Sequence, residues 1–147
     1  GNVLTRLRKL DDGEFSALVL AGAGLLRLGL EHRISRWFST EEILPAAGQA
    51  ILAVQARQGV DTSCLQTFAD SVSRDCLLTE RAFVRTLDGG CSSPVAAFAT
   101  IDGNILTLKG MYVTPNETCC FETACGPRRE GEALGRALAE EMRRKYR

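Results

Sequence analysis

The chain has 147 residues, of which 45% are hydrophobic and 24% charged, a composition typical of a soluble globular protein with one domain or two small lobes. Basic and acidic residues number 18 each, so net charge points to neither a nucleic acid nor a membrane partner. The longest apolar run, at 17–26, is too short to span a bilayer. Six cysteines without a secretory signal favour free thiols in a reducing cytosol, so we expect a cytoplasmic protein.

The cysteines do not predict a metal site. The sequence has no C-x-x-C pair, His32 is its only histidine, and Cys119 and Cys120 are adjacent, a spacing poorly suited to sharing one metal. A redox or metal-binding protein that uses these two thiols with Cys91 and Cys125 stays open as an alternative.

The first part of the chain reads as part of an α/β lobe. A short helix is expected over 5–13, ended by Gly13. The continuous apolar run at 16–22 favours a strand buried on both faces. A brief helix over 23–30 follows it, with Gly29 near its end. Strand, turn and helix in this order form half of a βαβ unit.

A second apolar strand is expected at 50–56. It follows the segment 39–49, which opens with a Ser-Thr helix-capping pattern and is stopped by Pro45. The polar, turn-rich residues 57–63 are the best candidate for a boundary between lobes.

The pattern of the remaining residues predicts a different organisation, α+β. Asp102-Gly103 is a strong signal for a two-residue hairpin. The last helix carries an apolar residue every four positions, at Leu134, Leu138, Met142 and Tyr146. We expect helices over 62–72, 73–88 and 130–146, and antiparallel strands over 95–101, 104–113 and 118–125. The fold class is therefore α+β: a partial α/β lobe followed by a domain with a three-stranded antiparallel sheet packed against helices.

Cys91 lies in the stretch LDGGCSSP, at 87–94, between an expected helix and an expected strand. Two glycines before it permit positive φ and leave access to the sulfur. Arg81 and Arg85 are nearby cations that would favour the reactive thiolate. Taken locally, an ordinary turn cysteine is the simpler interpretation, and a chemical role is the alternative.

Three further side chains are candidates for binding. Arg6 lies in the first turn of a helix, where a guanidinium and backbone N–H groups could bind a carboxylate together. Arg27 follows a predicted buried strand, near the crevice where open α/β sheets bind ligands. Gln49 follows a glycine and could bond a polar ligand or cap a turn. Taken alone, each is more simply a surface residue.

Four segments in order resemble the porphobilinogen deaminase (hydroxymethylbilane synthase) family, and together they cover nearly the whole chain. They are GNVLTRLRKLDDGEFSALVLAGAGLLRLGL at 1–30, ILPAAGQAILAVQAR at 43–57, TERAFVRTLDGGCSSPVAAFA at 79–99 and IDGNILTLKGMYVTP at 101–115.

The resemblance implies an activity and a cofactor. The family joins four porphobilinogen molecules, with loss of ammonia, into hydroxymethylbilane for tetrapyrrole and haem biosynthesis. The chain grows on a dipyrromethane cofactor held by a thioether to the cysteine of the Gly-Gly-Cys loop, which matches Cys91. Arg6 and Arg27 match arginines that bind acetate and propionate carboxylates, and Gln49 matches a residue near the cofactor.

The resemblance also implies what this chain lacks. The family's catalytic aspartate belongs to its N-terminal domain, so we expect no catalytic residue and no deaminase activity in this chain alone, and no attached cofactor. The expected divisions are 1–57 as a remnant of the α/β lobes, 58–72 as a linker helix region and 73–147 as the domain with the anchoring cysteine.

Departures from the family pattern lie around Gln49 and Cys91. The family usually has Gly-Gln-Gly and a strand ending in Glu-Cys-Arg, whereas this chain has Ala50 in place of the second glycine and Gln55-Ala56 before Arg57. The cysteine is commonly followed by Gln-Val-Pro, whereas this chain has CSSP.

The implied partners are porphobilinogen, the growing pyrrole chain and the N-terminal half of the enzyme, with self-association of this chain as a further hypothesis. The alternative in the binding class is a module that holds a tetrapyrrole or another polycarboxylate without catalysis.

Overall fold

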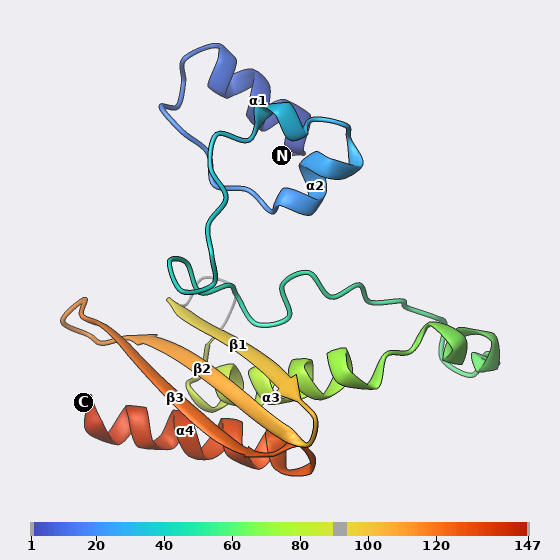
Figure 1. Cartoon of the computed structure of the whole chain (residues 1–147), viewed down its shortest axis with the longest axis vertical. Helices are drawn as coiled ribbons and strands as arrows, with labels where there is room; N and C mark the ends of the chain where they lie inside the picture. The colour runs from blue at the N-terminus through green and yellow to red at the C-terminus, as the bar shows by residue number, and fades with distance from the viewer. Residues whose placement is uncertain (1, 90–93, 147) are drawn as a thin grey trace. The chain divides into compact units, whose positions relative to one another are not determined.

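The computed structural model of the protein describes residues 2–89 and 94–146 (Figure 1). It divides into two compact units, an N-terminal unit, Gly1–Ser39, and a C-terminal unit, Thr40–Arg147. No helix in the described part of the chain is long and apolar enough to cross a membrane.

The N-terminal unit consists of short helices: α1 (Val3–Asp11), α2 (Gly22–Arg27) and the 3-10 helix η1 (Glu31–Arg33). The Asn2 side chain caps α1 by accepting a hydrogen bond from the N–H of Thr5 at 2.8 Å. Leu7 and Leu25 are its buried apolar side chains. The predicted helices over 5–13 and 23–30 are confirmed, each beginning one or two residues earlier.

Three predicted elements of the first 57 residues are wrong. Residues 16–21 and 51–56 form no strand, and 39–49 forms turns in place of a capped helix. A strand needs a neighbour for its backbone hydrogen bonds, and the three strands of the described chain pair only with one another. Val19 and Leu52 are accordingly 69% and 74% exposed. The capped segment is too short to overcome the cost of helix nucleation before Pro45.

The C-terminal unit has the predicted α+β organisation, which is confirmed. Its elements are η2 (Ser63–Phe68), α3 (Ser71–Thr86), β1 (Val95–Asp102), β2 (Ile105–Val113), β3 (Cys119–Pro127), η3 (Arg128–Glu130) and α4 (Gly131–Lys145). The strands form an antiparallel sheet in the order β1-β2-β3. Asp102 pairs with Ile105, so the hairpin loop is Gly103-Asn104, one residue later than predicted.

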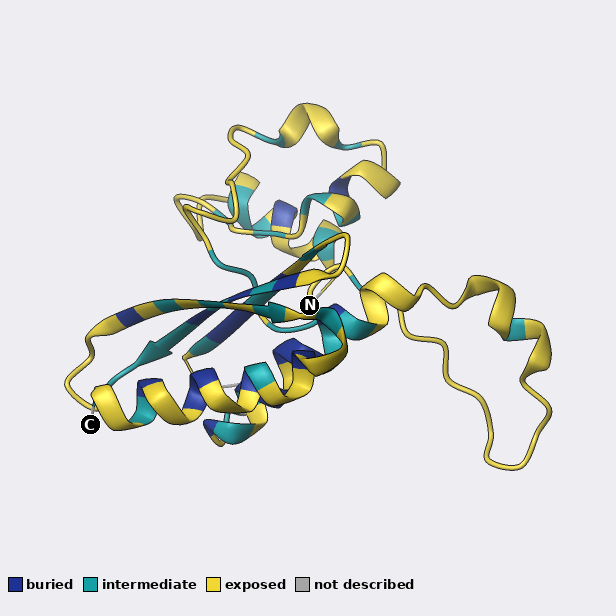
Figure 2. Ribbon diagram, turned by 60° about the horizontal axis from the view of Figure 1, so that its bottom comes forward, coloured by how far each residue is buried: buried dark blue, intermediate teal, exposed yellow. Residues whose placement is uncertain are grey.

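Both long helices pack on the same face of the sheet. Phe83 of α3, Leu106 and Leu108 of β2 and Met142 of α4 are the largest apolar side chains of this core, and all four are fully buried. Figure 2 shows buried residues on the helices and on the strands, whereas residues 52–64 are exposed throughout. The predicted apolar stripe of the last helix is confirmed, because Leu134, Leu138, Met142 and Tyr146 all belong to or pack against this core.

Close contact between α3 and α4 depends on two glycines. A Cβ added at Gly131 would lie 2.2 Å from Oγ1 of Thr79, and one at Gly135 would lie 2.5 Å from the backbone oxygen of the same residue. Since real Cβ contacts are never this short, only glycine permits this helix spacing.

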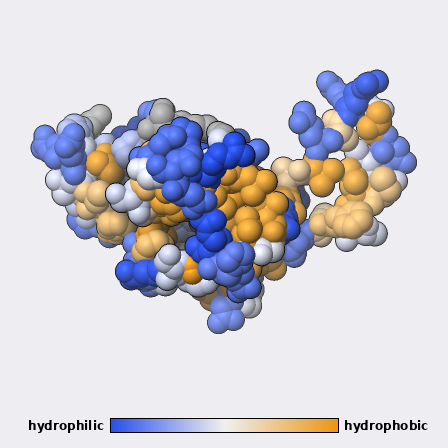
Figure 3. Space-filling view, turned by 90° about the horizontal axis from the view of Figure 1, so that it is seen from above, coloured by the Kyte–Doolittle hydropathy of each residue, from blue (hydrophilic) through white to orange (hydrophobic). Residues whose placement is uncertain are grey.

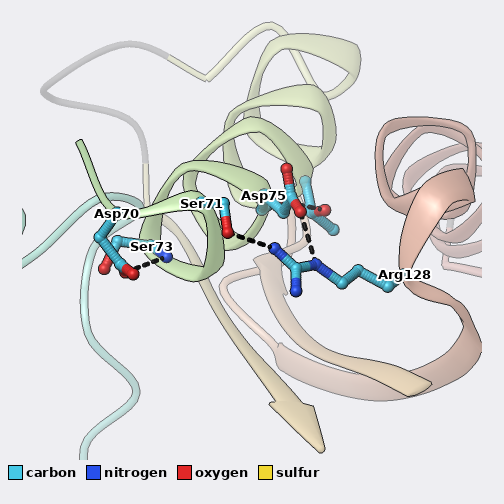
Figure 4. A network of polar contacts seen from close by, with 6 residues as sticks. Asp70, Ser71, Ser73, Asp75 and Arg128 are labelled. Atoms are coloured by element: carbon cyan, nitrogen blue, oxygen red, sulfur yellow. Dashed lines mark hydrogen bonds and ion pairs between the residues drawn. The ribbon is translucent and has the colours of Figure 1, made fainter. Parts of the chain in front are cut away.

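A polar network at the start of α3 fixes the chain that enters α4 (Figure 4). Asp70 caps α3 by accepting from the N–H of Ser73 at 2.7 Å. Arg128 of η3 donates to Oδ2 of Asp75 at 2.6 Å and to Oγ of Ser71 at 3.0 Å. These bonds hold the end of β3 against α3.

Apolar side chains also remain at the surface (Figure 3). Large exposed examples are Trp37, Phe38, Ile43, Leu52, Val54, Val60, Phe68 and Phe121.

Candidate cofactor-binding residues

The predicted anchor, Cys91, lies outside the described residues, but the end of the helix before it is well defined. The N–H of Gly89 bonds to the oxygen of Val84 at 2.9 Å, and Asp88 has a φ of +56°. This pattern is a Schellman motif, which ends helices with one left-handed residue. Aspartate is among the few residues other than glycine that adopt this conformation readily. The helix α3 therefore ends at Thr86, five residues before the cysteine.

An arginine from α4 holds this helix end. Arg143 donates to the backbone oxygen of Thr86 and, at 3.1 Å, to Oδ2 of Asp88. The carbonyls of the last helical turn lack partners within the helix, and a cation is favoured beside them. The start of the predicted anchor loop is thus tied to the last helix of the chain.

The two predicted carboxylate-binding arginines both lie in the N-terminal unit. Arg6 lies on α1 and Arg27 is the last residue of α2, and both are exposed. Neither guanidinium is hydrogen-bonded or ion-paired to another described residue, in contrast to Arg33, which pairs with Asp11 at 2.5 Å. Two unpaired guanidiniums have the chemistry required to bind ligand carboxylates.

Gln49 lies in a turn with unusual backbone geometry. The residues on either side of it, Gly48 and Ala50, have φ values of +76° and +69°. The N–H of Gln49 bonds to the oxygen of Ala46 at 3.0 Å, and that of Ile51 to the oxygen of Gly48 at 3.2 Å. The side chain of Gln49 is exposed and bonds to no other described residue, so its amide is available to a polar ligand.

Glu80, which was not among the residues predicted from the sequence, is only 5% exposed. Its Oε2 accepts from the N–H of Gly48 at 2.7 Å, and its Oε1 accepts from the N–H of Ala99 at 2.8 Å. Burial raises the pKa of this carboxyl above its ordinary 4.5, and the two hydrogen bonds oppose that rise. A signal was present, because Glu80 falls between Cys76 and Phe83 on the apolar face of the predicted helix.

The predicted site residues are divided between the two units. Arg6 and Arg27 belong to the N-terminal unit, whereas the Gln49 turn and the flanks of the Cys91 loop belong to the C-terminal unit. Within the latter, Glu80 connects the turn to β1, the strand that follows the loop.

The other cysteines are all free thiols in the described part of the chain. Cys119 is exposed and Cys120 is buried, as expected for neighbours on a strand. Burial raises the pKa of the Cys76 thiol, with the Glu80 carboxylate as a second cause. The described residues contain no group of three or more His, Cys, Asp or Glu side chains placed to hold a metal ion.

Comparison with known proteins decides the family. Residues 1–65 match the profile described as porphobilinogen deaminase, dipyromethane cofactor binding domain, and residues 75–144 match that of porphobilinogen deaminase, C-terminal domain. The chain belongs to the porphobilinogen deaminase family. The resemblance drawn from four sequence segments is confirmed, and so is the expectation of a dipyrromethane cofactor in the family.

Individual porphobilinogen deaminases are similar along nearly the whole chain. The one from Alkaliphilus oremlandii is 57% identical over 143 residues, which are 97% of this chain and 48% of that protein. Those from Acetivibrio thermocellus and Chromobacterium violaceum are 56% and 44% identical, again over 97% of this chain and over 49% and 47% of their own lengths. The chain thus spans about half the length of the porphobilinogen deaminases it matches.

Proposed function

We propose that this chain is the part of a porphobilinogen deaminase that anchors the dipyrromethane cofactor and binds carboxylates of the growing pyrrole chain. The observation that carries the proposal is the succession of two family profiles along residues 1–65 and 75–144. The complete enzyme would join four porphobilinogen molecules into hydroxymethylbilane. When bound, dipyrromethane supplies the primer on which the product grows.

The residues present fit that group in their chemistry. Acetate and propionate side chains require cations with paired donors, which the unpaired guanidiniums of Arg6 and Arg27 supply. Gln49, which matches a family residue near the cofactor, offers a neutral amide. Cys91 offers a thiol for a thioether, a bond that resists hydrolysis during turnover. The role of this chain is therefore to hold and orient, while proton transfer and cation stabilisation belong to the other half.

The proposal also includes a partner for this chain. We propose that the N-terminal half of the enzyme supplies the catalytic aspartate and the strands with which 16–22 and 50–56 pair. In support, both runs are apolar, lie in no strand and have exposed side chains such as Val19 and Leu52. Without that partner, the same surfaces favour self-association of the chain. We further propose that the protein works in the cytoplasm, where its cysteines stay reduced.

Intact-mass spectrometry tests the proposed function. The chain produced alone should be unmodified and inactive toward porphobilinogen. Produced together with the N-terminal half of the Alkaliphilus oremlandii enzyme, it should gain the mass of one dipyrromethane on the peptide that contains Cys91 and should turn over porphobilinogen.

Two serine variants serve as the matched pair in this experiment. Cys91→Ser should abolish the adduct and the activity, whereas Cys125→Ser, at another exposed cysteine, should retain both. Turnover by the chain alone, or an adduct that survives Cys91→Ser, would contradict the proposal. Heat of binding of hydroxymethylbilane to the isolated chain, without activity in any combination, would support the binding-module alternative.

A further inference from the structure

Glu80 is buried between two segments that are distant in sequence. Its carboxylate bonds to the N–H of Gly48, 32 residues earlier, and to the N–H of Ala99, 19 residues later. The side chain comes from α3, the turn from the start of the C-terminal unit, and Ala99 from the middle of β1. One carboxylate thus joins three separate parts of the fold.

No cationic side chain balances this carboxylate among the described residues. The nearest titratable group on the same helix face is the thiol of Cys76, four residues earlier, whose own pKa is raised. From the sheet, Lys109 is paired with Glu41 and not with Glu80. The two backbone N–H groups are therefore the only donors that the described chain gives to this carboxylate, although burying a carboxylate is costly.

The two N–H groups that bond to Glu80 lie in different structural settings, one in a strand and one in a turn. β1 is an edge strand, so the N–H of Ala99 that faces away from β2 would otherwise lack a partner. The N–H of Gly48 begins the turn that presents Gln49, and φ is positive on both sides of that residue. An amide side chain has one carbonyl oxygen and could not accept at both positions with two oxygens as a carboxylate does.

We propose that Glu80 is a positioning residue that fixes the Gln49 turn to the strand leaving the predicted anchor loop. It thereby holds the turn of Gln49, a predicted cofactor contact, in a constant relation to β1. The inference rests on the proposed function for its meaning, but the connection itself is a property of this chain.

Other contacts in the same region support this role. Ala47 packs against the core, and a Cβ at Gly48 would lie 2.8 Å from Cδ1 of Leu77, so the turn lies directly on α3. From Leu52 to Cys64 the chain is exposed. The turn is therefore held mainly from one side, and loss of a bond at Gly48 should free Gln49 while the core stays intact.

Amide NMR of the full 147-residue chain tests the inference without any pyrrole ligand. In the wild-type chain, the amide shifts of Gly48 and Ala99 should titrate together, with one midpoint above pH 4.5. Separate midpoints, or shifts that do not follow the Glu80 carboxyl, would overturn the proposal even if every variant failed to fold.

The variant Glu80→Gln should lose this titration. Its Gly48 amide should exchange with solvent at least about 10-fold faster, and the order parameter of Gln49 should fall below about 0.6. The amides of Leu106 and Leu108 should keep their protection. Glu141→Gln, an exposed control on α4, should change none of these signals. Unchanged exchange at Gly48 in Glu80→Gln would refute the role.

The reconstituted enzyme separates this inference from the proposed function. Glu80→Gln should still form the Cys91 adduct but show a raised KM for porphobilinogen and a pH profile without the Glu80 titration. If the wild-type chain forms no adduct even when it is produced together with the N-terminal half, while the NMR results hold, the proposed function fails and the structural connection stands.

Discussion

At the scale of single residues, Ala50 is the clearest case of strain. Its φ of +69° lies in the left-handed region, which costs a residue with a Cβ about 1–2 kcal/mol. Position 50 is also a departure from the pattern of the family that the chain resembles, in which a second glycine follows the glutamine. Glycine would adopt this φ without strain.

Ala50→Gly should therefore be more stable than the matched variant Ala53→Gly by about 1–2 kcal/mol. Both substitutions add the same conformational entropy to the unfolded state. Only the first relieves the strain of a positive φ, because the φ of Ala53 is not positive. Urea unfolding monitored by circular dichroism measures the difference. Equal free energies of unfolding for the two variants would show that Ala50 is not strained.

Glu80 should make the stability of the chain depend on pH. Because its pKa is raised in the folded state, the folded protein binds this proton more tightly than the unfolded chain. Its contribution to stability is complete below the ordinary pKa of 4.5 and is lost as pH rises through the folded value. The free energy of unfolding of Glu80→Gln should lack this decrease, whereas that of Glu141→Gln should keep it.

The two arginines should act on affinity in the reconstituted enzyme. Arg6→Leu and Arg27→Leu each remove a guanidinium proposed to bind a carboxylate, and hydrogen bonds to charged groups contribute about 1.5–3 kcal/mol. We expect kcat/KM for porphobilinogen to fall about 10- to 100-fold in each variant. Arg8→Leu, at an exposed position on the same helix as Arg6, should change it less than about 2-fold. Equal effects at Arg6 and Arg8 would contradict the assignment.

At the scale of elements, the two glycines of α4 set the distance between α3 and α4. A Cβ at Gly135 would meet a backbone oxygen, which cannot move aside as a side chain can. Sequence periodicity identified the buried stripe of this helix, but it did not show that the spacing between the helices needs glycine.

Gly135→Ala should lower the free energy of unfolding by about 1–3 kcal/mol, despite the better helix propensity of alanine. Gly126→Ala is the control, because its Cβ would lie at an ordinary 3.4 Å from Leu134, and it should change stability by less than about 0.5 kcal/mol. Thermal unfolding of both variants decides the matter, and a neutral Gly135→Ala would mean that the helices separate readily.

Elements formed by local contacts were predicted well. β1 and β2 are joined by a two-residue loop, and β3 follows after a short turn, so the signals that determine them lie close together in the sequence. The runs at 16–22 and 50–56 have equally good strand composition but no partner strand in the described chain. Composition indicates that a segment favours a strand, whereas pairing decides whether it becomes one.

At the scale of the whole molecule, the sequence predicts a linker helix region over residues 58–72, and its role as a linker stays a prediction. In the structure the exposed stretch before α3 precedes a sheet and two helices that share one core. A shortened chain of residues 69–147 should therefore fold by itself with a cooperative thermal transition. Its melting temperature should be lower than that of 40–147, because the Glu80 carboxylate loses the N–H of Gly48. A non-cooperative transition would show that the first part of the chain is required for folding.

The sequence by itself indicated the family, through four segments that resemble it in order, and the α+β class, through local periodicity. The resemblance also singled out Cys91, Arg6, Arg27 and Gln49, whose roles stay predictions. Only the tertiary structure showed that Glu80 connects the Gln49 turn to β1, that Ala50 has a positive φ and that Arg143 holds the end of α3. Each of these depends on groups from segments distant in sequence, or on a backbone angle that no residue type fixes. Such relations come into existence only when the chain folds.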